Sequence, residues 1–297
     1  MKTSSILDLI GNTPLVEARG LIKNKNVRLL LKMEGNNPGG SVKDRPAYNM
    51  IRSALERKEI DQHTRLIEAT SGNTGIALAM IAGFYKLNIE LVMPENSTKE
   101  RVQTMRAFGA TVTLTSADKG IEGSRDYAEM KVKKEGCLML NQFANEDNWK
   151  AHYKTTGPEI WRDTDHNVTH FVSAMGTTGT IMGVSTFLKE KDPSIQIIGA
   201  QPTDQSKIPG IRKWPEAYLP KIFDRSKVDR ILEVSETEAR EMSIRLAREE
   251  GVFSGMSSGG SVTTALKIAN EIESGVIVCI ICDRGDRYLS SDLFNFS

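Results

Sequence analysis

The chain has 297 residues, 39% of them hydrophobic, which is enough for about two domains with large buried cores. Its 39 Lys and Arg residues against 38 Asp and Glu residues leave a formal net charge of +1, so no field is present that would attract nucleic acid or an anionic membrane. No apolar run approaches the ~18 residues of a membrane-spanning helix, and residues 1–9 lack the pattern of a signal or transit peptide, so we expect a cytoplasmic protein.

One lysine stands at the junction between a glycine-rich turn and a helix. Residues 27–33 are predicted to form a strand, residues 36–40 a tight turn, and residues 43–58 a helix with apolar side chains at helical spacing. Lys43 therefore lies in the first helical turn, where the positive end of the helix dipole disfavours a cation. A neutral Schiff base with an aldehyde cofactor would remove that conflict. The alternative is an ordinary exposed lysine beside a turn.

Two later strand-turn-helix junctions carry glycine and small hydroxyl residues in the turn. Such turns aim backbone N–H groups and hydroxyls at an anion, so the pair predicts a cofactor phosphate and a substrate carboxylate. Neither has the P-loop lysine or the dinucleotide-binding spacing, and each alone is also compatible with an ordinary capped turn. The first junction comprises a strand at 65–69, the turn at 70–75 and a helix at 76–85; the second comprises a strand at 169–174, the turn at 176–180 and a helix from 181.

The rest of the chain continues the alternation of strand and helix, which favours parallel sheets covered by helices on both faces. A fourth small-residue turn at 255–260 precedes a helix predicted at 262–272, and Ser257 in this turn can face a heterocyclic nitrogen or act as an N-cap. Ser235 and Glu238 form a capping box for a helix that ends near Gly251. The remaining strands are predicted at 89–93, 111–115, 138–142, 196–201, 230–234 and 276–282.

The segment 202–227 lacks periodicity and contains several prolines and aromatic residues. Irregular stretches of this length are usually functional or disordered, and this composition favours an ordered lid or wall. An interface loop is the alternative.

The three cysteines argue against a disulfide framework. Cys279 and Cys282 have the spacing of a redox motif, but they fall in an apolar run predicted to be a buried strand. Residues i and i+3 of a strand point to opposite faces, so the two sulfur atoms should diverge. We expect Cys279 to serve packing and leave the role of Cys282 open. The four histidines form no ligand cluster; surface or packing roles are expected for them, and no metal site is predicted.

These elements, in this order, resemble the fold-type II pyridoxal phosphate enzymes and, among them, the cysteine synthase family. The resemblance covers nearly the whole chain. Thr178 and the segments 208–212 and 281–285 look like the B isozyme type, which also uses thiosulfate. Gly39 and Pro46 depart from the family pattern, which puts local geometry in doubt but no proposed contact. The motifs that carry the resemblance lie at 12–15, 39–45, 70–75, 155–161, 176–180 and 286–290.

The resemblance implies an α/β fold of two parallel-sheet domains with the cofactor in the cleft between them, where open parallel sheets bind ligands. Residues 39–149 would form the N-terminal α/β domain with the cofactor lysine and the substrate-carboxylate loop. Residues 1–38 plus 150–297 would form the C-terminal α/β domain with the phosphate loop and the serine at the pyridine nitrogen. A homodimer is also implied.

The resemblance further implies a β-replacement on pyridoxal 5'-phosphate that converts O-acetyl-L-serine and sulfide into L-cysteine. Lys43 would carry the cofactor and act as the base for the α-proton. Arg212 is our candidate for admitting thiosulfate, because a guanidinium stays charged and binds oxyanions with a fork of donors; an exposed loop arginine is the alternative. The implied cofactor contacts are Asn73, Gly176, Thr177, Thr178, Gly179, Thr180 and Ser257, and the implied contacts to the substrate carboxylate are Thr70, Ser71, Thr74 and Gln142.

Three other functions fit parts of the pattern. A cystathionine β-synthase would condense serine with homocysteine using the same lysine and loops. A serine or threonine dehydratase usually has a phosphate loop richer in glycine than residues 176–180. A catalytically silent ligand-binding relative is the third, and the joint presence of Lys43, Asn73, Gln142 and Ser257 argues against it.

Overall fold

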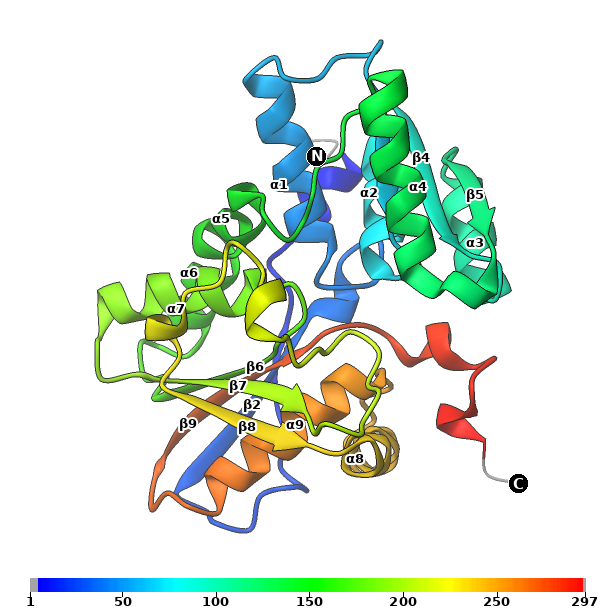
Figure 1. The fold of residues 1–297 in the computed structure, drawn as a ribbon. Coiled ribbons are helices and arrows are strands. Elements are labelled where there is room, and N and C mark those ends of the chain that lie inside the picture. Colours follow the sequence, from blue (N-terminus) through cyan, green and yellow to red (C-terminus); the bar gives the residue numbers. More distant parts are fainter. Residues whose placement is uncertain (1–4, 296–297) are drawn as a thin grey trace.

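The computed structural model describes residues 5–295 and contains two sheets, each covered by helices (Figure 1). Residues 1–4 of the 1–9 segment and residues 296–297 of the 150–297 range lie outside the described residues. A three-stranded parallel sheet has the order β3-β4-β5, and a six-stranded sheet has the order β1-β2-β9-β6-β7-β8, parallel except for β1. The strands are β1 Leu15–Glu17, β2 Val27–Met33, β3 Arg65–Ala69, β4 Asn88–Pro94, β5 Thr111–Thr115, β6 His170–Ala174, β7 Gln196–Pro202, β8 Arg230–Val234 and β9 Gly275–Ile281.

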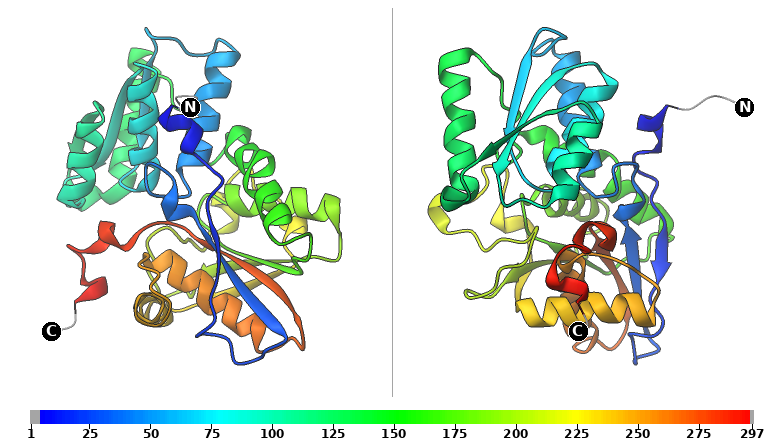
Figure 2. Two further views of the ribbon diagram at one scale, coloured as in Figure 1. Left: turned by 180° about the vertical axis from the view of Figure 1, so that it is seen from behind. Right: turned by 90° about the vertical axis from the view of Figure 1, so that its right-hand side faces the viewer.

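Nine α-helices of the described chain pack around the two sheets. In Figure 1, α1 to α4 surround the small sheet, while α8 and α9 lie below the large one. The views of Figure 2 show the N-terminal segment passing beside the small sheet before it enters β1 and β2 of the large sheet. The helices are α1 Asp44–Glu56, α2 Asn73–Phe84, α3 Lys99–Ala107, α4 Gly120–Glu135, α5 Glu146–Lys154, α6 Thr156–Asp163, α7 Gly179–Lys191, α8 Glu236–Glu249 and α9 Met256–Ala269.

The core of the small sheet is organised by α2. Every residue from Thr74 to Ala82 in this helix is buried, as expected for a helix that is apolar on all sides. Because α2 is enclosed by its neighbours, its N-terminal turn is held firmly at the carboxyl end of β3.

The large sheet has a separate core on each face. Along β9, Ile277 and Cys279 pack with α8 and α9, whereas Val278 and Ile280 pack on the opposite face with residues of α6 and α7. Cys282 packs against that second core, so the two sulfur atoms diverge as predicted.

Most predicted strands agree with the structure to within one residue at each end. The strand predicted at 138–142 is wrong, since Leu138 forms only an isolated bridge with Leu66. Asn141 has φ 53°, a left-handed conformation that ends an extended run. The three-residue strand β1 was not predicted, because its sequence is too short to display alternation.

Helix starts were predicted less well than strands. Lys43 is the N-cap of α1 rather than a residue of its first turn. The helix predicted from 262 begins at Met256, so Ser257 lies inside its first turn and Gly255 is the N-cap. A Cβ on Gly259 would lie 2.0 Å from the carbonyl oxygen of Ala239, which shows that small residues here serve close packing of α8 on α9 rather than a turn. The capping box of Ser235 and Glu238 is confirmed.

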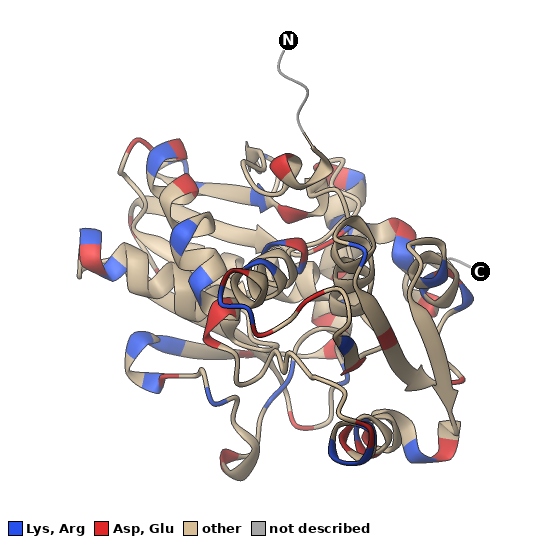
Figure 3. Cartoon of the chain, turned by 90° about the horizontal axis from the view of Figure 1, so that it is seen from above, with Lys and Arg blue, Asp and Glu red and all other residues tan. Residues whose placement is uncertain are grey.

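The segment 202–227 is ordered around two short 3₁₀ turns, Glu216–Tyr218 and Arg225–Lys227. Trp214 Nε1 donates a hydrogen bond of 2.8 Å to the carbonyl oxygen of Gly176, so the segment forms a wall beside the turn at 176–180. Charges of both signs are spread over the helices (Figure 3). Within residues 5–295 no helix is long and apolar enough to cross a membrane, and no group of three or more potential metal ligands is found.

Candidate active site

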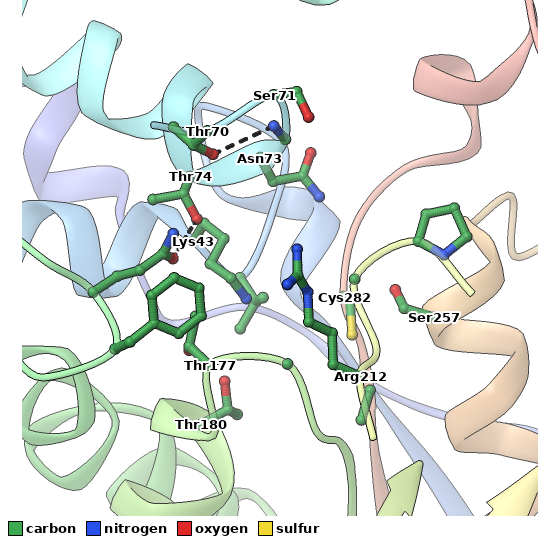
Figure 4. A pocket seen from close by; sticks show the side chains of 18 of the residues that line it. Lys43, Thr70, Ser71, Asn73, Thr74, Thr177, Thr180, Arg212, Ser257 and Cys282 are labelled. Atoms are coloured by element: carbon green, nitrogen blue, oxygen red, sulfur yellow. Dashed lines mark hydrogen bonds between the residues drawn. The ribbon is translucent and has the colours of Figure 1, made fainter. Parts of the chain in front are cut away.

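A cavity of about 310 Å³ lies where β3, β6 and β9 end, at the edge between the two sheets (Figure 4). Ligands of open parallel sheets bind at such carboxyl ends. Of the predicted site residues, Gly179 does not line the cavity; those that do are Lys43, Thr70, Ser71, Asn73, Thr74, Gln142, Gly176, Thr177, Thr178, Thr180, Arg212 and Ser257.

Lys43 enters the cavity from the start of α1. Its neighbour Val42 donates a backbone hydrogen bond of 2.8 Å to Cys282, and Ser41 bridges to Asp283, so this turn is fixed to the end of β9. Burial lowers the pKa of the Lys43 amine, although Cys282, Asp283 and Glu34 act in the opposite direction. A lysine whose charged form is disfavoured has more of its amine in the neutral form, which can attack as a nucleophile or accept a proton.

A buried charge network anchors the first turn of α1. Arg45 Nε lies 2.6 Å from Glu34 Oε2, and Arg45 Nη1 lies 2.6 Å from Glu159 Oε1. Lys32 Nζ lies 2.8 Å from the other oxygen of Glu159. The network ties α1 to β2 and α6, and so it holds the backbone on which Lys43 stands.

The turn between β3 and α2 presents the start of a fully buried helix to the cavity. Thr74 Oγ1 donates a hydrogen bond of 2.8 Å to Gln142 Oε1, and the N–H of Gly72 lies 3.4 Å from Thr70 Oγ1. Since the amide oxygen of Gln142 accepts from Thr74, its NH₂ group is the part that offers donors. Helix N–H groups, hydroxyls and this amide together suit a carboxylate.

The turn between β6 and α7 has the features of an anion cradle. Thr178, the N-cap of α7, has φ 69°, a strained conformation for a β-branched residue. Its Oγ1 is buried without a hydrogen-bond partner in the described structure. A Cβ on Gly176 would lie 2.5 Å from the carbonyl oxygen of Gly210. An orphaned hydroxyl beside the N-terminus of α7 fits a phosphate group, so these residues suit a phosphorylated cofactor.

Helix α5 supports both turns from behind. Asn148 Nδ2 donates to the backbone oxygen of Gln142 at 2.7 Å and to Thr177 Oγ1 at 3.2 Å. One turn further on, His152 Nε2 lies 3.3 Å from Thr180 Oγ1. Burial lowers the pKa of His152 to about 3, so the ring is neutral. His152 lies within α5 and is buried in a packing role, one of the two roles expected for the histidines.

Asn73 is bound to residues that sequence reasoning did not assign to the site. Its Nδ2 donates to Asp283 Oδ2 at 2.7 Å, and Arg287 Nη1 donates to its Oδ1 at 2.5 Å. Tyr288 OH donates to the same Asp283 oxygen at 2.6 Å. The signal was present in the motifs at 281–285 and 286–290, but spacing alone did not reveal that they turn back onto α2.

Ser257 and Cys282 lie on the side of the cavity opposite the turns at 70–75 and 176–180 (Figure 4). Burial raises the pKa of the Cys282 thiol to about 11, which leaves it protonated and makes a packing role the simpler one. Ser257 is buried, and a Cβ on Gly210 would lie 3.5 Å from its Cβ, so the wall segment closes over it. Because Ser257 lines the cavity, its hydroxyl is a candidate partner for a ring nitrogen.

Arg212 stands at the mouth of the cavity. Its backbone N–H donates to Met175 at 2.8 Å, and its guanidinium lies over the Trp214 ring at 5.2 Å from the ring centre. Figure 4 shows the guanidinium pointing into the pocket. The adjacent Lys213 is instead held by Asp204 and Glu233 at 2.6 Å each.

Comparison with known proteins assigns this arrangement to a family. The model of the pyridoxal-phosphate dependent enzymes matches residues 6–283. Cysteine synthase B of Pseudomonas aeruginosa is 56% identical over 98% of this chain and 97% of its own length. The crystal structure of a cysteine synthase from Entamoeba histolytica has a TM-score of 0.95 at 37% identity, covering 100% of this chain and 92% of that one. An O-acetylserine dependent cystathionine β-synthase from Helicobacter pylori has a TM-score of 0.88 at 34% identity, covering 99% and 100%. The chain belongs to the pyridoxal-phosphate dependent enzymes and, within them, to the cysteine synthase family.

Proposed function

We propose that this enzyme forms L-cysteine from O-acetyl-L-serine and sulfide, and that thiosulfate serves as a second sulfur donor. The observation that carries the proposal is the convergence of Lys43, two anion-binding turns and Ser257 on one cavity. Two anion sites flanking an amine suit an amino acid and a phosphorylated cofactor held side by side. We also propose that the protein acts in the cytoplasm as a homodimer, as the family resemblance implies.

The residues present fit pyridoxal phosphate. Gly176, Thr177, Thr178, Gly179 and Thr180 would take the phosphate, with Asn73 and Ser257 at the ring. When bound, the cofactor supplies an aldehyde that an amine can capture and a ring that withdraws electrons from the substrate's α-carbon. A serine hydroxyl at the ring nitrogen, in place of a carboxylate, does not hold that nitrogen protonated, which suits elimination and replacement over transamination.

The substrate carboxylate would bind at the other turn. Thr70, Ser71 and Thr74 offer hydroxyls and helix N–H groups, and Gln142 offers its amide. A carboxylate fixed there leaves the α-proton to Lys43, whose burial favours the neutral, proton-accepting form.

Lys43 removes the α-proton, and acetate leaves with the electron pair of the Cβ–O bond. Hydrosulfide then forms the Cβ–S bond, and a proton returns to Cα. With thiosulfate, the terminal sulfur forms that bond and the product is S-sulfocysteine, so two negative charges enter and two leave. Arg212 is the residue we propose to admit the dianion, because its guanidinium points into the pocket.

A second candidate is the condensation of O-acetylserine or serine with homocysteine. The match to the O-acetylserine dependent cystathionine β-synthase from Helicobacter pylori favours this second candidate. The test compares product formation by mass spectrometry from O-acetylserine with sulfide, O-acetylserine with homocysteine, and serine with homocysteine. We expect cysteine to form with the highest kcat/KM. Preferential formation of cystathionine would overturn the proposal, and Lys43→Ala is the matched inactive control.

A further inference from the structure

A second arginine faces the mouth of the cavity from the side of the small sheet. Arg125 of α4 lines both the reaction cavity and an adjoining groove of about 990 Å³, and Arg212 lines the same two spaces. Arg125 belongs to a helix that covers the small sheet, whereas Arg212 follows β7 of the large sheet. The two cations therefore approach one entrance from opposite sides.

Two aromatic rings that touch each other support this pair. The guanidinium of Arg125 lies 5.4 Å from the ring centre of Phe143, and that of Arg212 lies 5.2 Å from the ring centre of Trp214. The rings of Phe143 and Trp214 are themselves in edge contact, with centres 5.4 Å apart. Stacking on a connected aromatic pair limits where each guanidinium can go.

Among the described residues, the carboxylates that act on Arg125 are weak counter-charges: Glu122 is exposed, and burial raises the pKa of Glu68 to about 7. In the described part of the chain no carboxylate forms an ion pair with Arg212. Burial, followed by the positive charge of Arg125, lowers the pKa of Arg212, although an arginine stays charged at any working pH. Arg125 pairs with Glu122 at 3.1 Å, but 67% of the Glu122 side chain is exposed, and such pairs contribute little. Two like charges at one entrance are stabilised by an anion that reaches both.

We propose that Arg125 and Arg212 form a two-point binding site for a small dianionic sulfur donor, with Glu122 competing for Arg125. The proposal rests on the use of thiosulfate suggested above. A sulfonate-like head has three oxygens, enough to accept from both guanidinium forks, while its terminal sulfur stays free to react. Hydrosulfide carries one charge on one atom and cannot bridge the pair. Arg125 would therefore set the preference between donors rather than the chemistry at Cα.

The sharpest test of the two-point site compares two variants that should change the preference for thiosulfate over sulfide in opposite directions. Arg125→Ala should lower the ratio of kcat/KM for thiosulfate to that for sulfide by at least about tenfold, the size of one charge-assisted hydrogen bond. Glu122→Gln should raise the ratio by about two- to fivefold, because an exposed competitor is removed. Asp126→Asn removes the same charge from α4 without touching the pair, and Arg245→Ala on α8 removes a comparable arginine far from the cavity; both should leave the ratio unchanged.

A direct measurement of thiosulfate binding tests the two-point site independently of whether thiosulfate acts as a sulfur donor. Sodium thiosulfate is titrated by calorimetry into the cofactor-loaded enzyme without O-acetylserine, against sodium chloride at equal ionic strength. We expect Arg125→Ala to weaken thiosulfate binding at least about tenfold and Glu122→Gln to strengthen it. If the wild type forms S-sulfocysteine and Arg125→Ala changes neither the ratio nor the affinity, the two-point site is wrong while the donor proposal stands. If the wild type forms none, the donor proposal fails, and the affinities alone decide the site.

Discussion

Asn73 and Asp283, 210 residues apart in the sequence, are joined by a hydrogen bond of 2.7 Å. Asn73 begins α2 of the small sheet, and Asp283 follows β9 of the large one. The bond thus spans the edge at which the cavity lies. Because Tyr288 donates to the same Asp283 oxygen, one buried carboxylate organises side chains from both sheets.

Removing that carboxylate should loosen the junction. We expect Asp283→Ala to lower the free energy of unfolding of the apoprotein by about 1–3 kcal/mol, because Asn73 and Tyr288 would lose a buried acceptor. Tyr288→Phe removes a single donor and should cost less. Urea unfolding followed by circular dichroism measures both, and equal stabilities of the two variants would contradict this account.

Asn148 should matter to cofactor and substrate together, since one NH₂ group supports both Gln142 and Thr177. Asn148→Ala is expected to weaken cofactor retention and raise KM for O-acetylserine, each by roughly tenfold for a lost buried hydrogen bond. Asn148→Asp should retain the cofactor less well still, because a carboxylate would lie behind the phosphate turn. Cofactor titration and saturation kinetics measure the two effects, with half-buried Lys150→Ala on the same helix as the control. An effect on KM alone would contradict the shared support.

The buried charge network that anchors α1 should contribute strongly to the free energy of unfolding. Although burial raises the pKa of Glu159, Arg45 and Lys32 bring it down to about 2. Glu159→Ala would leave these two buried cations short of a partner and should cost about 3–5 kcal/mol of unfolding free energy. Glu146→Ala, which removes an exposed carboxylate paired with Lys150, is the control and should have no measurable effect. If Glu159→Ala lowered the free energy of unfolding as little as Glu146→Ala, the proposed contribution of the network to stability would be contradicted.

Glu68 should make stability fall as pH rises. Burial raises its pKa from 4.5 to about 7, against the hydrogen bond from Asn141 and the charge of Arg125. The native state therefore holds a proton that the unfolded chain releases above pH ~4.5. The stability due to the neutral carboxyl is complete below that pH and is lost as pH rises towards 7. Relative to Glu68→Gln, wild-type unfolding free energy should decline between pH 4.5 and 7, as measured by urea unfolding; a constant difference would disprove the shift.

The parts of this molecule that local sequence could predict are those set by local physics. The glycine and hydroxyl residues of the turns at 70–75 and 176–180 are consecutive in the sequence, and the alternation of strand and helix predicted that both turns lie at strand ends. Asn148 and Arg125 could not be found in this way, because an ordinary helical asparagine or arginine acquires its role only from what the fold places opposite it. The turn predicted at 255–260 was wrong for the same reason, since close packing of α8 on α9 requires a small residue at Gly259.

The claim on which the account depends most is that Lys43 carries the cofactor. Its most direct test is borohydride reduction of the cofactor-loaded enzyme, followed by peptide mass mapping. We predict a phosphopyridoxyl group on the peptide that contains Lys43, and no such label in Lys43→Ala. A label on another lysine, or an unmodified Lys43 in a fully loaded and active sample, would contradict the account.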